Sequence, residues 1–514
     1  MSPLESHMPG KHYPSSPITP TGENGDLSMD GRIGIVDIGS NTVRLVVYDA
    51  PARLPIPIFN ERVACGLGKG LGQTGRLNPE GVELAMRTLG CFTNLVREMK
   101  VERFVLLATA AVREAADGSD FVEGIKHNFG FPVRVLSGTE EARLGAMGIL
   151  VGSPKADGIS GDMGGGSLDL VSLDMGEFGN SATLPLGHLR VAEDSGSDPS
   201  RARDLIAKQF DSCRWLGEAP GHTLYAVGGA WRAIARIYID QTKYPLSVLD
   251  NFTVDAEEAR SFAQLIGGQS PKSLEQTIGV ARRRADTLPF AALVLDRLLE
   301  VTQPKQLIFS GYGLREGQFF EMLSPEMKKE DPLISACEGF AIRGGRFSVH
   351  GEEIASWMGP LFKDESENYH RLCHAAALLS DIGWTEHPDY RALHSFIRVL
   401  RLPISGVTHR QRIMLALAVF IRYDGKRRQY EVRQVRDLLS EKDQHRASVM
   451  GVALRFTHLL SGGVPGILPR TRLKMSKSKL KLIVDKASHV LIGETVESLF
   501  DDLADMLNLK GKIM

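Results

Sequence analysis

Short apolar runs, each closed by a turn rich in glycine, recur along the first part of the chain. Runs such as 43–48 and 104–108 are apolar or β-branched almost throughout, which predicts strands buried in the core of a sheet. Between these runs, Asn78 and Pro79 supply a cap and a first helical residue, and apolar residues at helical spacing follow to about Met99. Strands that alternate with helices predict an α/β fold.

One strand–turn–strand pattern occurs twice, in residues 35–49 and 161–174. Self-similarity at a fixed offset carries information about architecture. An offset of 125 residues predicts two similar domains, each with a turn that faces a common cleft, rather than a solenoid. The aligned pairs are Asp37 with Asp162, Gly39 with Gly164, Thr42 with Ser167, and Asp49 with Asp174.

The chemistry of these turns suits phosphate. Glycines reach positive φ and leave backbone N–H groups bare, and successive N–H groups form a nest for anions. An Asp beside such a turn can hold Mg²⁺, the cation that accompanies phosphates. For either copy alone, a structural β-hairpin turn is the alternative. The phosphate-binding candidates are Gly39, Ser40 and Asn41 in the first turn and Gly164, Gly165, Gly166 and Ser167 in the second.

Further glycine turns follow apolar strands at Gly228-Gly229 and at Gly311. A strand that leads through glycines into a helix presents the helix N-terminus to a phosphate. Ligands of open α/β sheets lie beyond the carboxyl ends of the strands. Thr109, Arg113 and Arg190 are therefore additional candidates for phosphate contacts. For Arg113, a salt bridge on a helix surface is the alternative.

A strand at residues 133–136 leads into a helix whose first turn carries Glu140 and Glu141. The helix dipole stabilises acidic residues in a first turn, which accounts for them without any function. Thr139 followed by Arg143 is not a capping box, so we expect no capping role for the two glutamates. Adjacent helical residues project in different directions, so one glutamate can face the cleft while the other lies in solvent.

Length and composition narrow the class of protein. A chain of 514 residues holds about three or four domains, and 43% hydrophobic with 24% charged residues is typical of a soluble globular protein. The net charge of −1 does not suggest nucleic acid as a partner, so any polyanion must bind at a local cluster of positive charge. No apolar stretch reaches the ~20 residues of a membrane span. Five scattered cysteines predict a reduced, cytoplasmic protein without a metal cluster.

Both ends of the chain differ from the glycine-rich middle. Residues 1–30 are rich in Pro, Ser and Gly, and we expect them to be disordered or a cloning remnant. From about residue 330 helical patterns dominate, and one helix is expected to end at Gly383. Asp381 follows Ser380 and not a histidine, which argues against a His-Asp metal site. Four lysines of a short strand pair form either a solvated edge or a path for a long anion: Lys474, Lys477, Lys479 and Lys481.

In combination, these motifs resemble the actin, sugar-kinase and heat-shock-chaperone superfamily with its two ribonuclease-H-like domains. Within it, the chain resembles the Ppx/GppA family of exopolyphosphatases and guanosine pentaphosphate phosphohydrolases. The resemblance covers residues 31–320 closely, and residues 330–514 more loosely match the family's helical HD-phosphohydrolase-like domain. The motifs that carry it are Val36-Asp37-Ile38-Gly39-Ser40-Asn41, Thr109 with Arg113, Ser137-Gly138-Thr139-Glu140-Glu141-Ala142-Arg143-Leu144, residues 161–167, and Leu314-Arg315-Glu316-Gly317.

The resemblance implies ribonuclease-H-like domains at 31–145 and 146–328 and a mainly helical HD-like domain with a short β tail at 329–514. Members of the family remove the terminal phosphate from linear polyphosphate or guanosine pentaphosphate and use Mg²⁺. Their catalytic glutamate is the second of the Glu-Glu pair, here Glu141. The matched metal and phosphate positions are Asp162, Asp37, Asn41, Arg113, Arg315, the backbone of 164–167, and Asp169. Asp169 stands where relatives often have Glu, so the resemblance implies that it reaches a metal through water.

The expected function is an exopolyphosphatase in which Glu141 activates the attacking water. Polyphosphate is favoured over guanosine pentaphosphate, the alternative within the family, because the sequence exposes no base pocket. An ATP-dependent kinase or ATPase and a non-enzymatic polyphosphate or alarmone sensor are further alternatives. The third domain is expected to hold polymer or to form a homodimer. Further polymer contacts are expected from Lys69, Arg190, Arg232 and the four C-terminal lysines.

Overall fold

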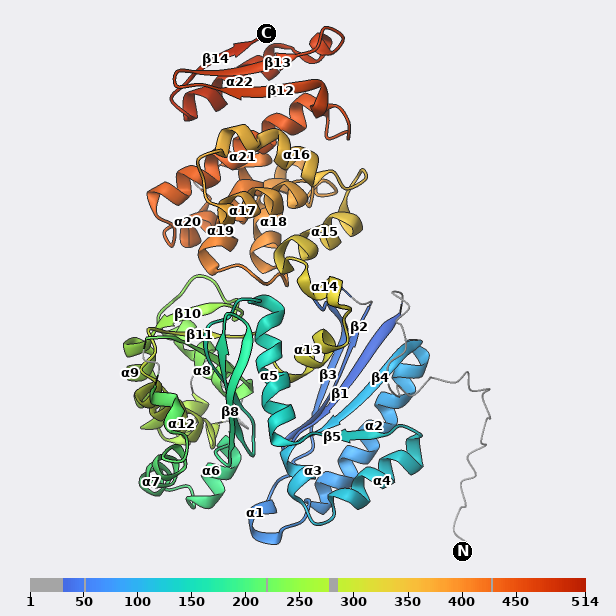
Figure 1. The fold of residues 1–514 in the computed structure, drawn as a ribbon, viewed down its shortest axis with the longest axis vertical. Helices are drawn as coiled ribbons and strands as arrows, with labels where there is room; N and C mark the ends of the chain where they lie inside the picture. The colour runs from blue at the N-terminus through green and yellow to red at the C-terminus, as the bar shows by residue number, and fades with distance from the viewer. Residues whose placement is uncertain (1–30, 50–51, 219–220, 277–284, 427–428) are drawn as a thin grey trace, which may run out of the picture. The chain divides into compact units, whose positions relative to one another are not determined.

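Figure 1 shows a computed structural model of the chain, which describes residues 31–49, 52–218, 221–276, 285–426 and 429–514. The segment 1–30, expected to be disordered, lies outside the described residues. The chain forms two compact units. The first comprises Met1–Pro51, Pro57–Lys69 and Gly75–Val135, and the second comprises Ala52–Ile56, Gly70–Thr74 and Leu136–Met514.

The first unit is built on a five-stranded sheet with the strand order β3-β2-β1-β4-β5. Strand β2 is antiparallel to β1 and β3, whereas β1, β4 and β5 run parallel. The predicted core strand at 43–48 lies in β2, and the helix predicted after Asn78 is α2. The elements are β1 (Arg32–Ile38), β2 (Thr42–Tyr48), β3 (Pro57–Ala64), α2 (Pro79–Glu98), β4 (Val101–Ala108), α3 (Ala110–Glu114), α4 (Gly118–Phe129) and β5 (Val133–Val135).

The second unit contains a six-stranded sheet with the order β10-β11-β9-β6-β7-β8. Without β10, and read from β8 to β11, the order β8-β7-β6-β9-β11 corresponds strand by strand to β3-β2-β1-β4-β5 of the first sheet. The turn is repeated as well: Gly39 N–H donates to Thr42 O at 2.9 Å, and Gly164 N–H donates to Ser167 O at 3.0 Å. The predicted duplication, and the fold of two ribonuclease-H-like domains that it implies, are therefore confirmed. The strands are β6 (Gly158–Met163), β7 (Leu168–Asp174), β8 (Glu177–Leu184), β9 (Thr223–Val227), β10 (Phe252–Asp255) and β11 (Gln306–Phe309).

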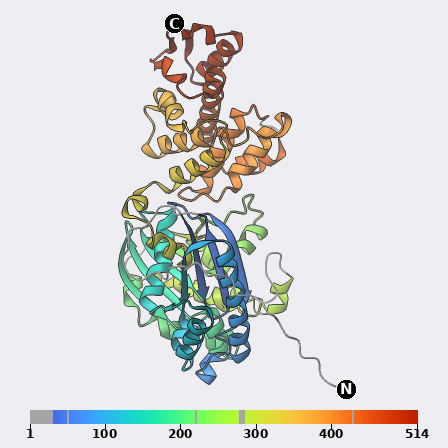
Figure 2. The ribbon, with the colours of Figure 1, turned by 90° about the vertical axis from the view of Figure 1, so that its right-hand side faces the viewer.

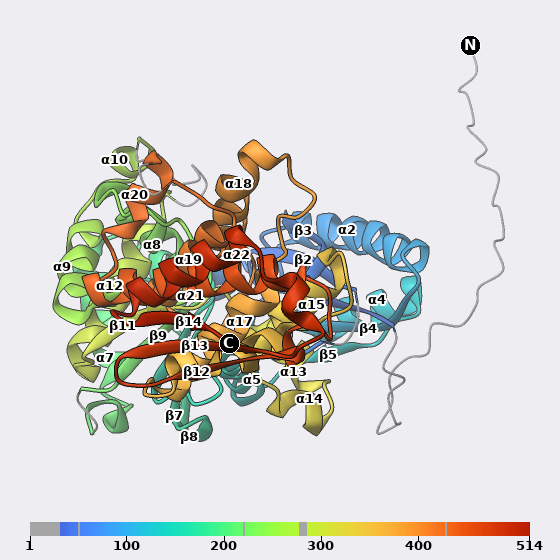
Figure 3. The ribbon, with the colours of Figure 1, turned by 90° about the horizontal axis from the view of Figure 1, so that it is seen from above.

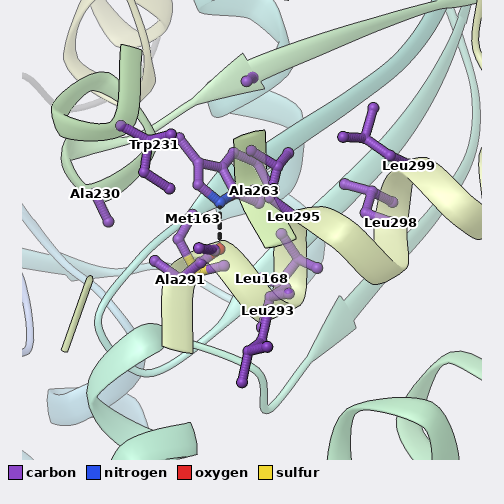
Figure 4. Packing of buried hydrophobic residues seen from close by; sticks show 14 of the residues in the cluster. Met163, Leu168, Ala230, Trp231, Ala263, Ala291, Leu293, Leu295, Leu298 and Leu299 are labelled. Carbon is purple, nitrogen blue, oxygen red and sulfur yellow. Dashed lines mark hydrogen bonds between the residues drawn. The ribbon is translucent and has the colours of Figure 1, made fainter. Parts of the chain in front are cut away.

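A buried tryptophan anchors the second sheet to its helices (Figure 4). The indole N–H of Trp231 donates to Ala291 O at 2.9 Å, and the ring lies against Gly161, where a Cβ would be 3.1 Å from the indole. This packing supports β6 one residue before Asp162. The helices of this region are α5 (Gly138–Gly152), α6 (His188–Asp194), α7 (Pro199–Phe210), α8 (Gly229–Gln241), α9 (Ala256–Gly267), α10 (Pro271–Glu275), α12 (Leu288–Thr302), α13 (Leu314–Glu321) and α14 (Pro325–Lys329), and α1 (Leu71–Thr74) belongs to the same unit.

The C-terminal part of the second unit is mainly helical, as predicted, and it ends in a three-stranded sheet of order β12-β13-β14 where a strand pair was expected (Figures 2 and 3). The helix expected to end at Gly383 already ends at Leu379, because the chain tightens into a turn in which Ser380 N–H donates to Ala377 O. The elements are α15 (Pro332–Gly344), α16 (Gly351–Met358), α17 (Glu367–Leu379), α18 (Pro388–Arg401), α19 (His409–Arg422), α20 (Tyr430–Arg436), α21 (Glu441–Ser461), β12 (Thr471–Met475), β13 (Lys479–Val484), α22 (Glu494–Met506) and β14 (Lys510–Ile513).

The predicted domain boundary at residue 145 lies inside α5. This helix packs on β6, β7, β8 and α13, so it belongs to the second unit over its whole length. Within the described residues, no helix has the length and apolar character needed to span a membrane.

Candidate functional site

Helix α5 begins with a capping box, which corrects the expectation that Glu140 and Glu141 have no capping role. Ser137 Oγ accepts a hydrogen bond from Glu140 N–H at 3.2 Å, and Glu140 Oε2 accepts one from Ser137 N–H at 2.9 Å. The motif starts at Ser137, two residues before Thr139. Glu140 therefore closes the N-terminal end of α5.

Glycines flank Glu141 along one face of α5. A Cβ at Gly145 would lie 3.0 Å from Asp162 Oδ2, and a Cβ at Gly148 would lie 2.4 Å from Gly313 O. Residues four apart share a helix face, so the Glu141 side chain starts on the face that meets Asp162. Glycine at these positions lets the helix backbone approach the end of β6 and the start of α13.

Three carboxyl groups influence one another beside this face: Glu141, Asp162 and Asp169. Asp162 and Asp169 are direct partners across β6 and β7. Asp169 is only 4% exposed. Burial raises its pKa well above the usual value, the charges of Glu141 and Asp162 raise it further, and hydrogen bonds from Thr183 and Ser167 act against them.

Both carboxylate oxygens of Asp169 accept hydrogen bonds from the protein. Thr183 Oγ1 donates to Oδ1 at 2.7 Å, and Ser167 Oγ donates to Oδ2 at 3.1 Å. Among the described residues, no three His, Cys, Asp or Glu side chains are arranged to hold a metal ion. Mg²⁺ is commonly bound by one or two carboxylates together with substrate phosphates. A pair of neighbouring carboxyl groups such as Asp162 and Asp169 fits that mode, and the metal roles predicted for them and for Asp37 stay predictions.

Two arginines lie in the same electrostatic environment as Asp162. The pKa of Arg232 is lowered by burial and then by the neighbouring charge of Arg315, while Glu316 and Asp162 act in the opposite direction. Arg232 Nη1 donates to Gly311 O at 3.1 Å, which fixes the guanidinium beside the turn after β11. Arg315 was predicted to contact phosphate, but Arg232 was expected only as part of a polymer path.

The glycine turn after β6 is held from one side by α6. His188 N–H donates to Gly164 O at 3.3 Å, and Leu189 N–H and Arg190 N–H donate to Gly165 O at 3.0 and 3.2 Å. In a trans peptide the carbonyl and the following N–H point in opposite directions. The N–H groups of Gly165 and Gly166 are therefore directed away from the first turn of α6, as an anion nest requires.

The predicted glycines at the start of α8 are sterically required. Gly228 has φ 105°, and a Cβ there would lie 2.4 Å from Met163 O, the carbonyl that precedes the glycine turn. Gly229 begins α8 directly behind it. The structure thus gathers, in the second unit, the predicted Glu141, Asp162, Asp169, Gly164–Ser167, Arg190, Gly228, Gly229 and Arg315.

The first unit carries the other predicted group. A Cβ at Gly39 would lie 3.8 Å from Asp37 Oδ1 and 4.0 Å from Thr109 Oγ1, so these two side chains flank the turn. The loop that contains Lys69 packs on the same turn, because Gly66 N–H donates to Asn41 O at 3.0 Å and Gly68 N–H donates to Ser40 O at 2.8 Å.

Arg113 extends from α3, the short helix that follows Thr109. Its guanidinium lies 4.0 Å from Glu114 Oε1, and its N–H donates to Thr109 O at 3.1 Å. This long ion pair is the surface contact foreseen as the alternative for Arg113. Its role in phosphate binding stays a prediction.

Comparison with known proteins identifies the family of this chain. Residues 46–326 match the Ppx/GppA phosphatase family, and residues 333–514 match the family described as exopolyphosphatase, C-terminal. The first match covers more than half of the chain. The chain therefore belongs to the Ppx/GppA phosphatase family.

The named relatives are distant. Retrograde regulation protein 2 of Saccharomyces cerevisiae is 26% identical over 438 residues, which cover 76% of this chain and 72% of that protein. Exopolyphosphatase 1 of Mycobacterium tuberculosis is 25% identical over 312 residues, or 57% of this chain and 89% of that protein. The fold also matches the crystal structure of an exopolyphosphatase from Cytophaga hutchinsonii, with 22% sequence identity and a TM-score of 0.52. The match covers 57% of this chain and 97% of that chain.

Proposed function

We propose that this phosphatase is an exopolyphosphatase, which releases terminal orthophosphate from linear inorganic polyphosphate. One observation carries the proposal: Asp162 and Asp169 are direct partners across β6 and β7 beside a glycine turn, and the face of α5 that bears Glu141 meets Asp162 at Gly145. Arg232 and Arg315 lie in the same electrostatic environment as Asp162. Carboxylates, cationic guanidiniums and bare N–H groups are the groups that phosphoanhydride hydrolysis needs. Contacts of this kind recognise phosphate without a base.

In the proposed reaction the N–H groups of Gly165 and Gly166 and the Arg315 guanidinium bind the terminal phosphate. Glu141 orients a water molecule and removes its proton as that water attacks phosphorus. The bond to the bridging oxygen breaks, and orthophosphate leaves from the end of the chain. In the first unit, Asp37, Asn41, Thr109 and Arg113 are proposed to supply further phosphate contacts.

Mg²⁺ is the proposed cofactor. The carboxylates of the site suit a divalent cation. Burial and the negative charges of Glu141 and Asp162 raise the pKa of Asp169, and a bound Mg²⁺ would reduce the repulsion between these carboxylates. When bound at Asp162, Mg²⁺ would neutralise charge on the non-bridging oxygens of the substrate. Asp37 is proposed as a second carboxylate and Asp169 as a contact through water.

A regulatory role is the second candidate function. It is favoured by the likeness to yeast Retrograde regulation protein 2, which extends over 76% of this chain and so reaches beyond the two α/β domains into the C-terminal region. A regulator would bind polyphosphate or a guanosine polyphosphate without turning it over. Guanosine pentaphosphate is the alternative substrate because the matched family model includes the GppA phosphatases.

The proposal is tested by release of orthophosphate from long-chain polyphosphate and, in parallel, from guanosine pentaphosphate, each with Mg²⁺ and with a chelator. Fast Mg²⁺-dependent release from polyphosphate with slow release from the nucleotide is the expected result. The reverse ranking would assign the nucleotide as substrate. Saturable binding of either compound without release would favour the regulator.

A further inference from the structure

A pocket of about 760 Å³ opens in the C-terminal helical region, and among the described residues its lining includes none of the groups assigned above. This volume lies in the range of small-molecule sites. Arginines enter it from four different elements: Arg346 from the α15–α16 connection, Arg391 from α18, Arg422 from α19 and Arg455 from α21.

Asp381 holds two of these arginines in place. Arg346 Nε donates to Asp381 Oδ2 at 3.1 Å, and Arg422 Nη2 donates to Asp381 Oδ1 at 2.9 Å. One carboxylate therefore balances two guanidiniums, and one positive charge remains. Each guanidinium has five N–H donors, so donors remain for a ligand. The Nε–H of Arg422 is buried without an acceptor among the described residues.

A histidine beside this pair reports the local positive charge. Burial lowers the pKa of His458 to about 3, and the charge of Arg422 is the next largest cause. The ring is fixed by Ser380, whose Oγ lies 2.8 Å from His458 Nε2. His458 is therefore neutral at physiological pH and adds a polar wall to the pocket without a charge.

The ring of Tyr423 contacts two of the arginines through cation–π interactions. The guanidinium carbon of Arg422 is 4.1 Å from the centroid of the Tyr423 ring, and that of Arg391 is 5.8 Å from it. Arg391 is anchored by the carbonyls of Trp384 and Glu386, each at 3.0 Å. This side of the pocket thus combines a flat apolar surface with fixed cationic groups.

Helix α22 lines the pocket with side chains of the opposite character. Glu494, Ser498 and Asp502 are spaced four residues apart, so they share one face of the helix, and Thr495 lines the pocket beside them. Carboxylates and hydroxyls accept hydrogen bonds from ligand hydroxyl or amino groups. The pocket is therefore polarised, with arginines on several helices and acceptors on α22.

We propose that this pocket binds a small phosphate ester that also carries hydroxyl or amino groups, such as a nucleoside monophosphate. The arginines bind the phosphate, and the acceptors of α22 bind the sugar hydroxyls. The assignment rests on the two kinds of groups in the pocket, because arginines suit the phosphate and the acceptors of α22 suit the hydroxyl or amino groups of the same ligand. The site is independent of the phosphatase reaction proposed above, so either proposal can fail alone.

Calorimetry with the full chain tests the proposal, with adenosine 5′-monophosphate as the probe. Arg455→Ala removes an arginine of the pocket, whose Nη1 also donates to Asp424 Oδ1 at 2.5 Å, and Asp502→Ala removes an acceptor of α22. Matched controls are Arg433→Ala, an exposed arginine of α20, and Asp501→Ala, whose carboxylate lies toward Gly511 in the last strand. We expect each pocket variant to weaken binding about tenfold or more, and each control to leave it unchanged.

Two further titrations separate the ends of the ligand. Adenosine, which lacks the phosphate, and inorganic phosphate, which lacks the nucleoside, should each bind at least about tenfold more weakly than the monophosphate. Equal binding of inorganic phosphate would contradict the role of α22. Binding of the monophosphate that is unaffected by Arg455→Ala and Asp502→Ala would place it at another site and overturn the proposal, as would the absence of binding.

Discussion

The close approach of α5 to α13 can be tested with one methyl group. In Gly148→Ala the new Cβ would lie 2.4 Å from Gly313 O and 2.7 Å from Gly313 Cα. These neighbours are backbone atoms and cannot rotate away. A normal contact needs about 3.5 Å, so the two helices must separate by roughly 1 Å.

The expected cost follows from that displacement. Overpacking of this kind destabilises by about 1–3 kcal/mol, whereas replacing glycine by alanine in a helix gains about 1 kcal/mol. Gly339→Ala in α15 is the matched control, because its Cβ would meet none of the described residues within 4 Å. Gly339→Ala should therefore be stabilised by the helix propensity of alanine, about 1 kcal/mol, without any overpacking. The two variants should therefore differ by about 1–3 kcal/mol, and Gly148→Ala should melt several degrees lower.

The same displacement should reach Glu141, which lies two turns earlier on the same helix face as Gly148. A shift of about 1 Å in a catalytic group can lower turnover by a factor of about 10². We expect Gly148→Ala to lose between about tenfold and hundredfold in phosphate release, and Gly339→Ala to match the wild type. Equal melting temperatures and equal turnover in the two variants would refute the packing argument.

Two further predictions concern the caps and charges of the site. Ser137→Ala removes the acceptor for Glu140 N–H and should destabilise the protein by about 1 kcal/mol in thermal melts. Phosphate release should stay within a few-fold of wild type. A loss of activity as large as that of a Glu141 variant would contradict the separate roles of Glu140 and Glu141. The pKa of Asp169 is raised in the folded state. Above the ordinary Asp pKa of about 3.9, the native protein therefore binds more protons than the unfolded chain does. The contribution of Asp169 to stability thus falls as the pH rises from about 3.9 through the raised pKa. Asp169→Asn should flatten that fall in melts recorded in chelator, and an unchanged pH profile would contradict the coupling of the three carboxyl groups.

The repeat and its turns could be predicted from sequence because they depend on local patterns. Asp37 and Asp162 lie in the same short Asp-x-Gly pattern, and the fixed offset between the two copies indicated a duplicated domain. Glu141 was singled out only by family resemblance, since helix geometry left Glu140 as an equal choice. The Ser-x-x-Glu spacing from Ser137 to Glu140 is the sequence signal that distinguishes the two glutamates.

Other features depend on contacts between distant segments. Thr183 reaches Asp169 only through the register of β7 and β8, and Arg232 joins the site only because the turn at Gly311 packs beside it. The boundary predicted at residue 145 came from the family resemblance, whereas tertiary packing decides where α5 belongs. The glycines at 138, 145, 148 and 152 were the one available hint, because small residues at this spacing mark a helix face in close contact.

The most direct test of the proposed mechanism compares Glu141→Gln with Glu140→Gln in Mg²⁺-dependent release of orthophosphate from polyphosphate. Loss of a general base lowers the rate by a factor of about 10²–10⁴, so Glu141→Gln should fall by that amount while it still binds polyphosphate. Glu140→Gln should remain within a few-fold of wild type. Near-normal turnover in Glu141→Gln, or an equal loss in both variants, would contradict the assignment of Glu141 as the base.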